Sequence, residues 1–158
     1  MNHMKRKKRA TILLELSCGV LFLMALFMMA VDISLMMLAY QLNEKCCKEA
    51  CRAAAQQKTS TAAMQAATTA LAIHQGDGVY ISSPRLATIP GAFEYQDFGG
   101  DPLVGHPYVA VTTEITVKLP VPVIFIGNDL GKGGIGMSDT WVFRKRYSYP
   151  IVDLNLTL

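Results

Sequence analysis

The stretch that decides the fold is residues 11–40, TILLELSCGVLFLMALFMMAVDISLMMLAY, an apolar run interrupted by two acids. Residues 16–31 contain no charged side chain, and beyond Asp32 the run continues to Leu42. Because about 20 helical residues cross the hydrocarbon core of a bilayer, this length predicts one transmembrane helix over residues 11–40. Glu15 and Asp32 cannot both lie at mid-bilayer, so at least one of them is expected near an interface.

A basic leader, residues 1–10, precedes the apolar run. Its five consecutive cations are Lys5, Arg6, Lys7, Lys8 and Arg9. The other flank is balanced in charge, so the positive-inside rule predicts a cytoplasmic N-terminus and an exported C-terminal part. The whole chain carries 15 basic and 12 acidic residues, a formal charge of +3. Without the leader the acids outnumber the bases, so the overall basicity gives no support for nucleic acid as a partner.

Glu15 is the candidate functional residue of the apolar run. An intramembrane carboxylate costs about 3 kcal/mol even on lenient scales and needs a partner. Cleavage between Ala10 and Thr11 would supply one, because it creates a cationic α-amino group on Thr11. Glu15 would then be the fifth residue of the mature chain.

This arrangement resembles the type IV prepilins and pseudopilins, whose short basic leader prepilin peptidase removes at the cytoplasmic face. Three segments narrow the resemblance: residues 11–16 (TILLEL), 31–33 (VDI) and 42–54 (LNEKCCKEACRAA). Together they are similar to the TadE-like minor pseudopilins of tight-adherence (Tad/Flp) pili. The specific likeness covers about the first third of the chain. Ala10 stands where glycine is commoner, and Leu16 where an aromatic residue is usual.

The resemblance implies a structural subunit in a minor, initiating or tip-associated role, not an enzyme. Glu15 would pair with the terminal amine of a neighbouring subunit. Asp32 would lie at the outer interface or pair with a basic residue of an assembly partner. The implied partners are other pilins and pseudopilins, the inner-membrane assembly platform, the peptidase and membrane lipid. The implied location is the bacterial inner membrane, with the C-terminal domain periplasmic or extracellular; a place in the finished pilus is left open.

The competing interpretation is a single-pass membrane-anchored surface binding module with an uncleaved N-terminus. A removable signal peptide is disfavoured, because the apolar run continues well past the length of a usual signal sequence. An intact N-terminus in cells with active prepilin peptidase would favour the anchored module.

An extended exported helical region is expected over residues 41–75, because strong or neutral helix formers fill most of it. Residues 59–61 should interrupt it, with Ser60 or Thr61 capping a second stretch that runs through Ile73. Cys46, Cys47 and Cys51 lie in the first stretch. They are interpreted as small packing residues, as partners in an intermolecular disulfide, or as sites of metal or lipid attachment.

Residues 76–158 are expected to form a small antiparallel β domain packed on the distal helix, so the fold class is α+β. Strict alternation over residues 109–119 predicts a half-buried strand, and residues 140–149 predict a second one. Pro120 and Pro122 should end the first strand or force it to an edge. Residues 79–82 and 93–98 are weaker strand candidates, and the tail, residues 152–158, alternates again.

No catalytic motif withstands inspection. Residues 127–133, GNDLGKG, have one residue too few for a phosphate-binding loop and lack the hydroxyl residue that follows its lysine. The histidines are scattered and no spacing predicts a metal site, so no cofactor and no metal is expected. The basic and aromatic residues 144–149 are the main surface candidate: either a solvated edge, or a contact for anionic headgroups or an acidic surface.

Overall fold

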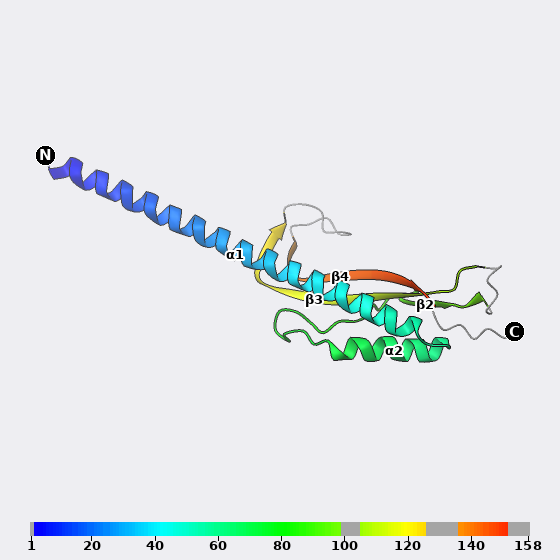
Figure 1. The fold of residues 1–158 in the computed structure, drawn as a ribbon. Coiled ribbons are helices and arrows are strands. Elements are labelled where there is room, and N and C mark those ends of the chain that lie inside the picture. Colours follow the sequence, from blue (N-terminus) through cyan, green and yellow to red (C-terminus); the bar gives the residue numbers. More distant parts are fainter. Residues whose placement is uncertain (1, 99–104, 126–135, 152–158) are drawn as a thin grey trace. The chain divides into compact units, whose positions relative to one another are not determined.

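A computed structural model describes the backbone of residues 2–98, 105–125 and 136–151, and the side chains of residues 12–98, 105–120 and 140–151. The chain divides into two units, Met1–Ser34 and Leu35–Leu158, and each is taken by itself. The elements are α1 (Asn2–Ala55), α2 (Ser60–Ile73), β1 (Arg85–Leu86), β2 (Phe93–Gln96), β3 (Tyr108–Phe125) and β4 (Gly136–Pro150) (Figure 1). A long N-terminal apolar helix followed by a small antiparallel sheet confirms the predicted α+β class.

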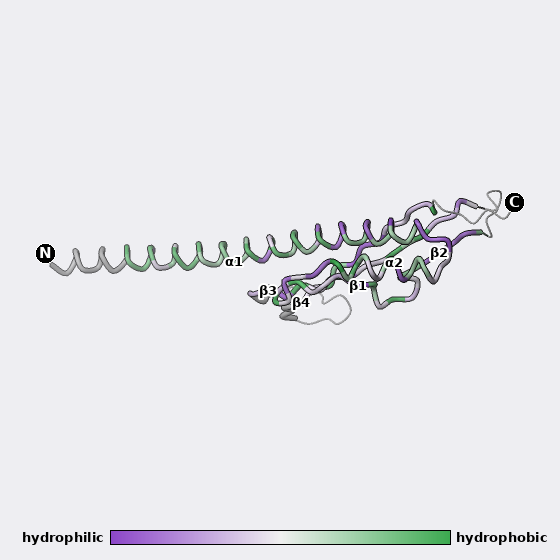
Figure 2. Tube along the Cα trace, turned by 60° about the horizontal axis from the view of Figure 1, so that its bottom comes forward, coloured by the Kyte–Doolittle hydropathy of each residue, from purple (hydrophilic) through white to green (hydrophobic). Residues whose placement is uncertain are grey.

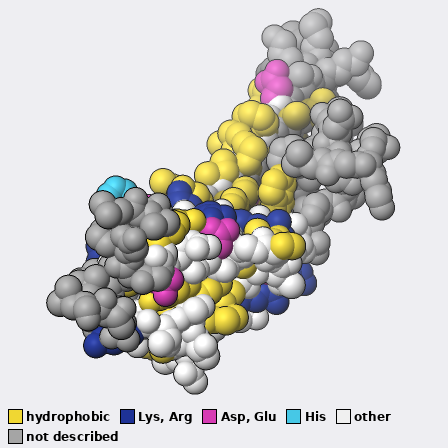
Figure 3. Space-filling view, turned by 90° about the vertical axis from the view of Figure 1, so that its right-hand side faces the viewer, with side chains coloured by type: hydrophobic (Ala, Val, Ile, Leu, Met, Phe, Trp, Pro, Cys, Tyr) yellow, Lys and Arg dark blue, Asp and Glu magenta, His cyan; other side chains and the backbone are white. Residues whose placement is uncertain are grey.

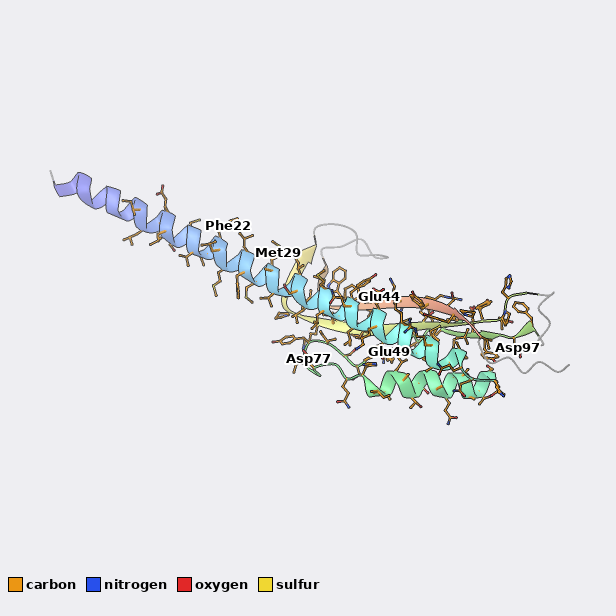
Figure 4. All side chains as sticks on the ribbon, in the orientation of Figure 1. Phe22, Met29, Glu44, Glu49, Asp77 and Asp97 are labelled. Carbon is orange, nitrogen blue, oxygen red and sulfur yellow. The ribbon has the colours of Figure 1, made fainter. Side chains whose placement is uncertain are left out.

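The N-terminal unit consists of the first part of α1. Its apolar side chains are exposed on all sides, for example Leu14 at 72% and Phe27 at 67%. Hydrophobic residues follow one another along this part of the helix (Figure 2), and hydrophobic side chains, in yellow, are visible on its surface (Figure 3). The labelled Phe22 and Met29 project from the helix (Figure 4). By length and composition α1 is compatible with a single-pass membrane anchor.

β3 is the central strand of the sheet. It pairs antiparallel with β4 along one edge, from Tyr108↔Pro150 onwards. Along the other edge lie, in chain order, the Ile81↔Val117 bridge, then β1 opposite Glu114 and Thr113, then β2 opposite residues 108–111. The predicted strand at 93–98 is thus confirmed in its main part, whereas the one at 79–82 is reduced to a single bridge. β1 was not anticipated.

Prolines do not end β3. The strand runs through Pro120 and Pro122 to Phe125, with a register shift against β4 between Lys118 and Val123. The last contact on the other edge is the Lys118 amide, which donates to the Tyr80 carbonyl. Beyond it, the described residues pair β3 with β4 alone. The prolines therefore occupy an edge position, the second of the two predicted outcomes. Proline has no backbone N–H, and at an edge no neighbouring strand requires one.

The core lies between the sheet and the two helices. Val109, Val111, Ile115 and Val117, alternate residues of β3, are fully buried against α1. α2 adds Ala63, Ala67 and Leu71, one face at four-residue spacing. The helices are interrupted at residues 56–59, so the predicted interruption at 59–61 overlaps the observed one only at Thr59. Thr59 is the cap, and its side chain accepts from the Ala62 amide. The expectation that Ser60 or Thr61 would be the cap was wrong by one or two residues. The alternating tail, 152–158, lies outside the described residues.

Candidate functional sites on α1 and the sheet

The proposed processing site lies within α1. The helix begins at Asn2, so Ala10, Thr11 and the leader cations are all helical residues. The side chains of residues 1–11 are outside the described part. A peptide bond inside a helix takes part in its hydrogen-bonded turns, so cleavage after Ala10 requires this turn to unwind.

Glu15 is exposed on α1 among large apolar side chains, including Ile12 at 61% and Leu16 at 64% exposure. Within the described residues its carboxylate makes no hydrogen bond or ion pair. About 17 residues separate it from Asp32 on the same helix, so the structure does not bring these two candidates together. Any partner for the Glu15 charge must come from the undescribed residues or from another molecule.

Asp32 differs from Glu15 in its burial. Its side chain is 2% exposed, and Oδ1 has no hydrogen-bond partner among the described residues. A buried carboxylate oxygen without a donor is costly. The pairing of Asp32 with a basic group therefore stays a prediction, and the cost of its unpaired buried oxygen is the physical reason for it.

The three distal cysteines are buried in the core, and Cys47 and Cys51 contact the sheet. Cys46, Cys47 and Cys51 are fully buried free thiols, and Cys46 and Cys51 belong to the core cluster that includes Val109 and Val111. Burial raises the pKa of Cys46 and of Cys51 to about 11. Burial also raises the pKa of Cys47, although its hydrogen bond with Thr113 lowers it in part. This geometry favours the packing interpretation, because a buried protonated thiol is a poor nucleophile for forming a disulfide with another chain.

A row of three polar side chains, which we call the α1 ladder, joins this helix to both long strands. It consists of Asn43, Cys47 and Cys51. Asn43 Nδ2 donates to the Phe143 carbonyl at 3.0 Å, and its Oδ1 accepts from the Thr113 hydroxyl at 2.7 Å. Four helical residues rise about 6 Å, close to the roughly 7 Å of two strand residues, so the pattern can repeat.

The next two rungs follow this spacing. Cys47 Sγ lies 3.3 Å from the carbonyls of Val111 and Lys145. Cys51 Sγ lies 3.4 Å from the Val109 carbonyl and 3.5 Å from that of Tyr147. Each thiol has one proton and donates to one carbonyl at a time. The α1 ladder therefore sets the register of the helix on the sheet.

The opposite face of the sheet carries a buried acid that sequence reasoning did not single out. Glu114 is 3% exposed. Its Oε1 accepts from Arg85 Nε at 3.0 Å and from the Thr88 hydroxyl at 3.1 Å, and its Oε2 accepts from Arg144 Nε at 3.2 Å. Burial raises the pKa of Glu114, but the hydrogen bonds from Arg144 and Thr88 and the charge of Arg85 outweigh it, so the pKa lies below its usual value. The alternation of residues 109–119 predicted on which face of the strand Glu114 lies, but it did not predict the partners of Glu114.

The basic and aromatic residues 144–149 divide between the two faces. Arg144 binds Glu114, and Arg146 binds Glu94 at 2.6 Å. The alternate residues Lys145, Tyr147 and Tyr149 face α1. There they form cation–π pairs with Tyr40, Lys48 and Arg52, at 5.0, 5.4 and 5.4 Å from ring centroid to cation. Most of this segment therefore stabilises the fold.

The described residues contain no group of three or more His, Cys, Asp or Glu side chains that could hold a metal ion. The polar groups of the α1 ladder and those around Glu114 are hydrogen-bonded to one another or to backbone carbonyls, an arrangement that stabilises the packing of the fold. No family model matches the chain, and neither a curated protein nor a solved structure matches it.

Proposed function

We propose that this chain is a minor pseudopilin-like structural subunit for the assembly or initiation of a Tad-type pilus or a related secretion system. The observation that carries the proposal is α1 itself. From Ile12 to Phe27 its large side chains are exposed in this chain, yet a carboxylate at Glu15 lies among them. Such a surface needs lipid or other helices around it, and the acid needs a cation from outside the described residues.

The sequence resemblance supports the same proposal. It supplies the cation as the α-amino group of Thr11 on a neighbouring subunit after cleavage. The continuation of α1 onto a sheet supports a subunit in which one helix both anchors the chain and carries an exported domain.

One observation favours the alternative, a surface binding module with an uncleaved N-terminus. The Ala10–Thr11 bond is helical, and helical bonds are not ready substrates for cleavage. In the alternative, Glu15 would contact another membrane protein without a processed amine.

The test combines mass spectrometry with pilus assembly in cells that have active prepilin peptidase. We expect the membrane-extracted chain to begin at Thr11. Glu15→Ala should still insert but should be absent from sheared pili and from crosslinks to other subunits. Glu44→Ala is the matched control, because Glu44 is on the same helix and its Lys48 pair is a partly exposed i,i+4 bridge of little energetic value.

An intact N-terminus would refute processing and leave the anchored module. Normal incorporation of Glu15→Ala would refute the pairing. Equal loss in the Glu44→Ala control would mean that the assay reports general damage.

A further inference from the structure

The outer edge of β4 has main-chain groups that β3 does not use. β4 is 15 residues long, and within the described part of the chain it pairs with β3 alone (Figure 1). In an antiparallel pair, alternate residues turn both their N–H and their C=O away from the partner strand. The hydrogen bonds on the other side of β3 show which residues of β4 do so.

The even-numbered residues of β3 direct their main chain away from β4. The Thr112 amide donates to the Ala92 carbonyl at 2.6 Å, and the Thr112 carbonyl accepts from the Ala87 amide at 2.9 Å. Arg146, which lies opposite Thr112 on β4, therefore turns its own N–H and C=O outward. The same alternation defines a set of outward residues that we call the β4 edge: Val142, Arg144, Arg146 and Ser148.

Among the described residues, no group bonds to the main chain of the β4 edge. The α1 ladder contacts β4 through the intervening residues, because it binds the carbonyls of Phe143, Lys145 and Tyr147. The side chains of the β4 edge are exposed as well, with Val142 at 51%. An exposed strand edge is a template on which a further strand can pair.

Positive charge accompanies this edge on the face of the sheet that carries Glu114. Arg144 and Arg85 share the single carboxylate of Glu114, so this group has one excess positive charge. Arg146 is balanced by Glu94, but its side chain is 52% exposed. Each guanidinium has five N–H donors, so both arginines of the β4 edge can bind a second carboxylate.

Partly buried aromatic side chains lie on the other face of the same stretch. Phe143 and Tyr147 alternate with the β4 edge and pack against the core clusters. A strand added to β4 would place alternate side chains beside the arginines and beside these rings, because side chains alternate between the two faces of a sheet. The surface therefore suits a segment in which acidic and apolar residues alternate.

A second copy of this chain fits the β4 edge poorly. Antiparallel pairing of two copies over residues 142–148 would set Arg144 of each copy opposite Arg146 of the other. Like charges directly opposite each other destabilise a strand pair. The charge of the edge thus favours a different, acidic partner.

We propose that the β4 edge binds an extended acidic segment of another protein, which joins the sheet as an additional strand. The main chain of the segment pairs with the β4 edge, and its acidic side chains meet Arg144 and Arg146. Its apolar side chains pack beside Phe143 and Tyr147. The inference goes beyond the proposed function and rests on the unit Leu35–Leu158 alone, so it requires neither the membrane anchor nor processing nor pilus assembly.

The test uses the full chain in micelles of an uncharged detergent and a fluorescent peptide in which glutamate and valine alternate. Fluorescence anisotropy should show saturable binding that weakens as salt rises. In the proposed pairing the glutamate amides face β4, because the glutamate side chains share a face with the arginines. A peptide methylated on its glutamate amides should therefore bind at least about tenfold more weakly. The matched peptide methylated on its valine amides has the same charge and should bind like the unmodified one.

Variants of the chain test the same edge from the other side. Ser148→Pro removes an outward N–H and should weaken binding about fivefold, whereas Ser148→Ala keeps that N–H and should bind normally. Arg146→Gln should weaken binding about threefold and reduce its dependence on salt. Lys45→Gln is the matched control, since it removes an exposed cation of α1 and should leave binding unchanged. Near-ultraviolet circular dichroism establishes that each variant keeps its native packing.

Equal binding of the two methylated peptides would overturn the proposal, because it would show attraction between charges without strand addition. Equal weakening by Arg146→Gln and Lys45→Gln would overturn the role of the β4 edge. Self-association of the chain that Ser148→Pro abolishes, without binding of the peptide, would assign the edge to a second copy and overturn the acidic partner. Each outcome leaves the proposed function intact, and failure of processing or pilus assembly would leave this inference intact.

Discussion

The hydrogen bond between Asn43 and Thr113 offers the sharpest test of how α1 is held on the sheet. Asn43 is 1% exposed and Thr113 is fully buried. Asn43→Leu removes two hydrogen bonds, about 1 kcal/mol each, and leaves the Thr113 hydroxyl unpaired at about 1–3 kcal/mol. We therefore expect this variant to lose about 3–5 kcal/mol of unfolding free energy.

Thr113→Val alone should cost about 1–3 kcal/mol, since it strands the Asn43 oxygen in the core. The double variant removes the Asn43 amide and the Thr113 hydroxyl together, so neither is left buried without the other. Its cost should therefore fall short of the sum of the single costs by about 1–2 kcal/mol, the coupling expected of residues in direct contact.

The assay is urea unfolding of the full chain in detergent micelles, followed by Trp141 fluorescence and circular dichroism. The control is Thr69→Val on α2, whose exposed hydroxyl bonds only to the Gln65 carbonyl and should matter by less than about 0.5 kcal/mol. Costs that add within about 0.5 kcal/mol would refute the coupling, and with it the α1 ladder as the device that sets the register.

Two further predictions concern titration. Because the pKa of Glu114 is lower in the folded chain than the usual value of 4.5, its ionised form adds stability above that value, and the stability is lost as the pH falls through the lowered pKa. Glu114→Gln should lower the unfolding free energy near neutrality by about 1–2 kcal/mol, a figure reduced for solvent screening at the exposed arginines. The unfolding free energy of this variant should also decline less steeply as the pH falls. An unchanged slope in acid would contradict the prediction. Cys46, Cys47 and Cys51 should resist maleimide at pH 8 until urea unfolds the sheet, as their burial and raised pKa values require. Peptide mass spectrometry locates the adducts and separates these three from the exposed Cys18; rapid labelling of any of the three in the native chain would contradict their buried placement.

The sequence was sufficient wherever a local period carried the information. Alternation over residues 109–119 predicted the strand and its apolar face, and the hydroxyl residues near 60 predicted a helix break. The strand is not half-buried as predicted, because Ala110, Thr112 and Glu114 on its other face are buried as well. Cys47 and Cys51 were harder, because their spacing is equally consistent with packing and with bridging. Only the carbonyls of β3 and β4, about 60 and 100 residues away in the chain, distinguish the two.

Glu114 shows the other limit of sequence reasoning. Its neighbours in the chain are threonine and isoleucine, and its partners Arg85 and Arg144 come from strands on opposite sides of β3. No local pattern links three residues that only sheet pairing brings together. A charged residue inside an alternating strand was the available signal, and it favours basic residues opposite it on the neighbouring strands without identifying them.

The α1 ladder also limits how the helix can move on the sheet. The row of α1 that faces the core reads Ala39, Asn43, Cys47, Cys51 at four-residue steps. A shift of one turn in one direction would place Leu35 in the space of Ala39 and Ala39 opposite Thr113, which overpacks one site and strands a hydroxyl at the next. The opposite shift would bury the Asn43 amide among Ile115 and Val117, where side chains offer no hydrogen bond.

Both shifts destabilise the fold. Asn43 is the one amide in the row, so either shift separates it from Thr113, and Leu35, on the N-terminal side of the row, is too large for the space of Ala39. The register is therefore fixed by composition as well as by contacts. A force applied along α1, as in the addition of a subunit to a filament, would be transmitted to the sheet and not absorbed by sliding. This is the mechanical property that the proposed role of α1, as both anchor and assembly element, requires.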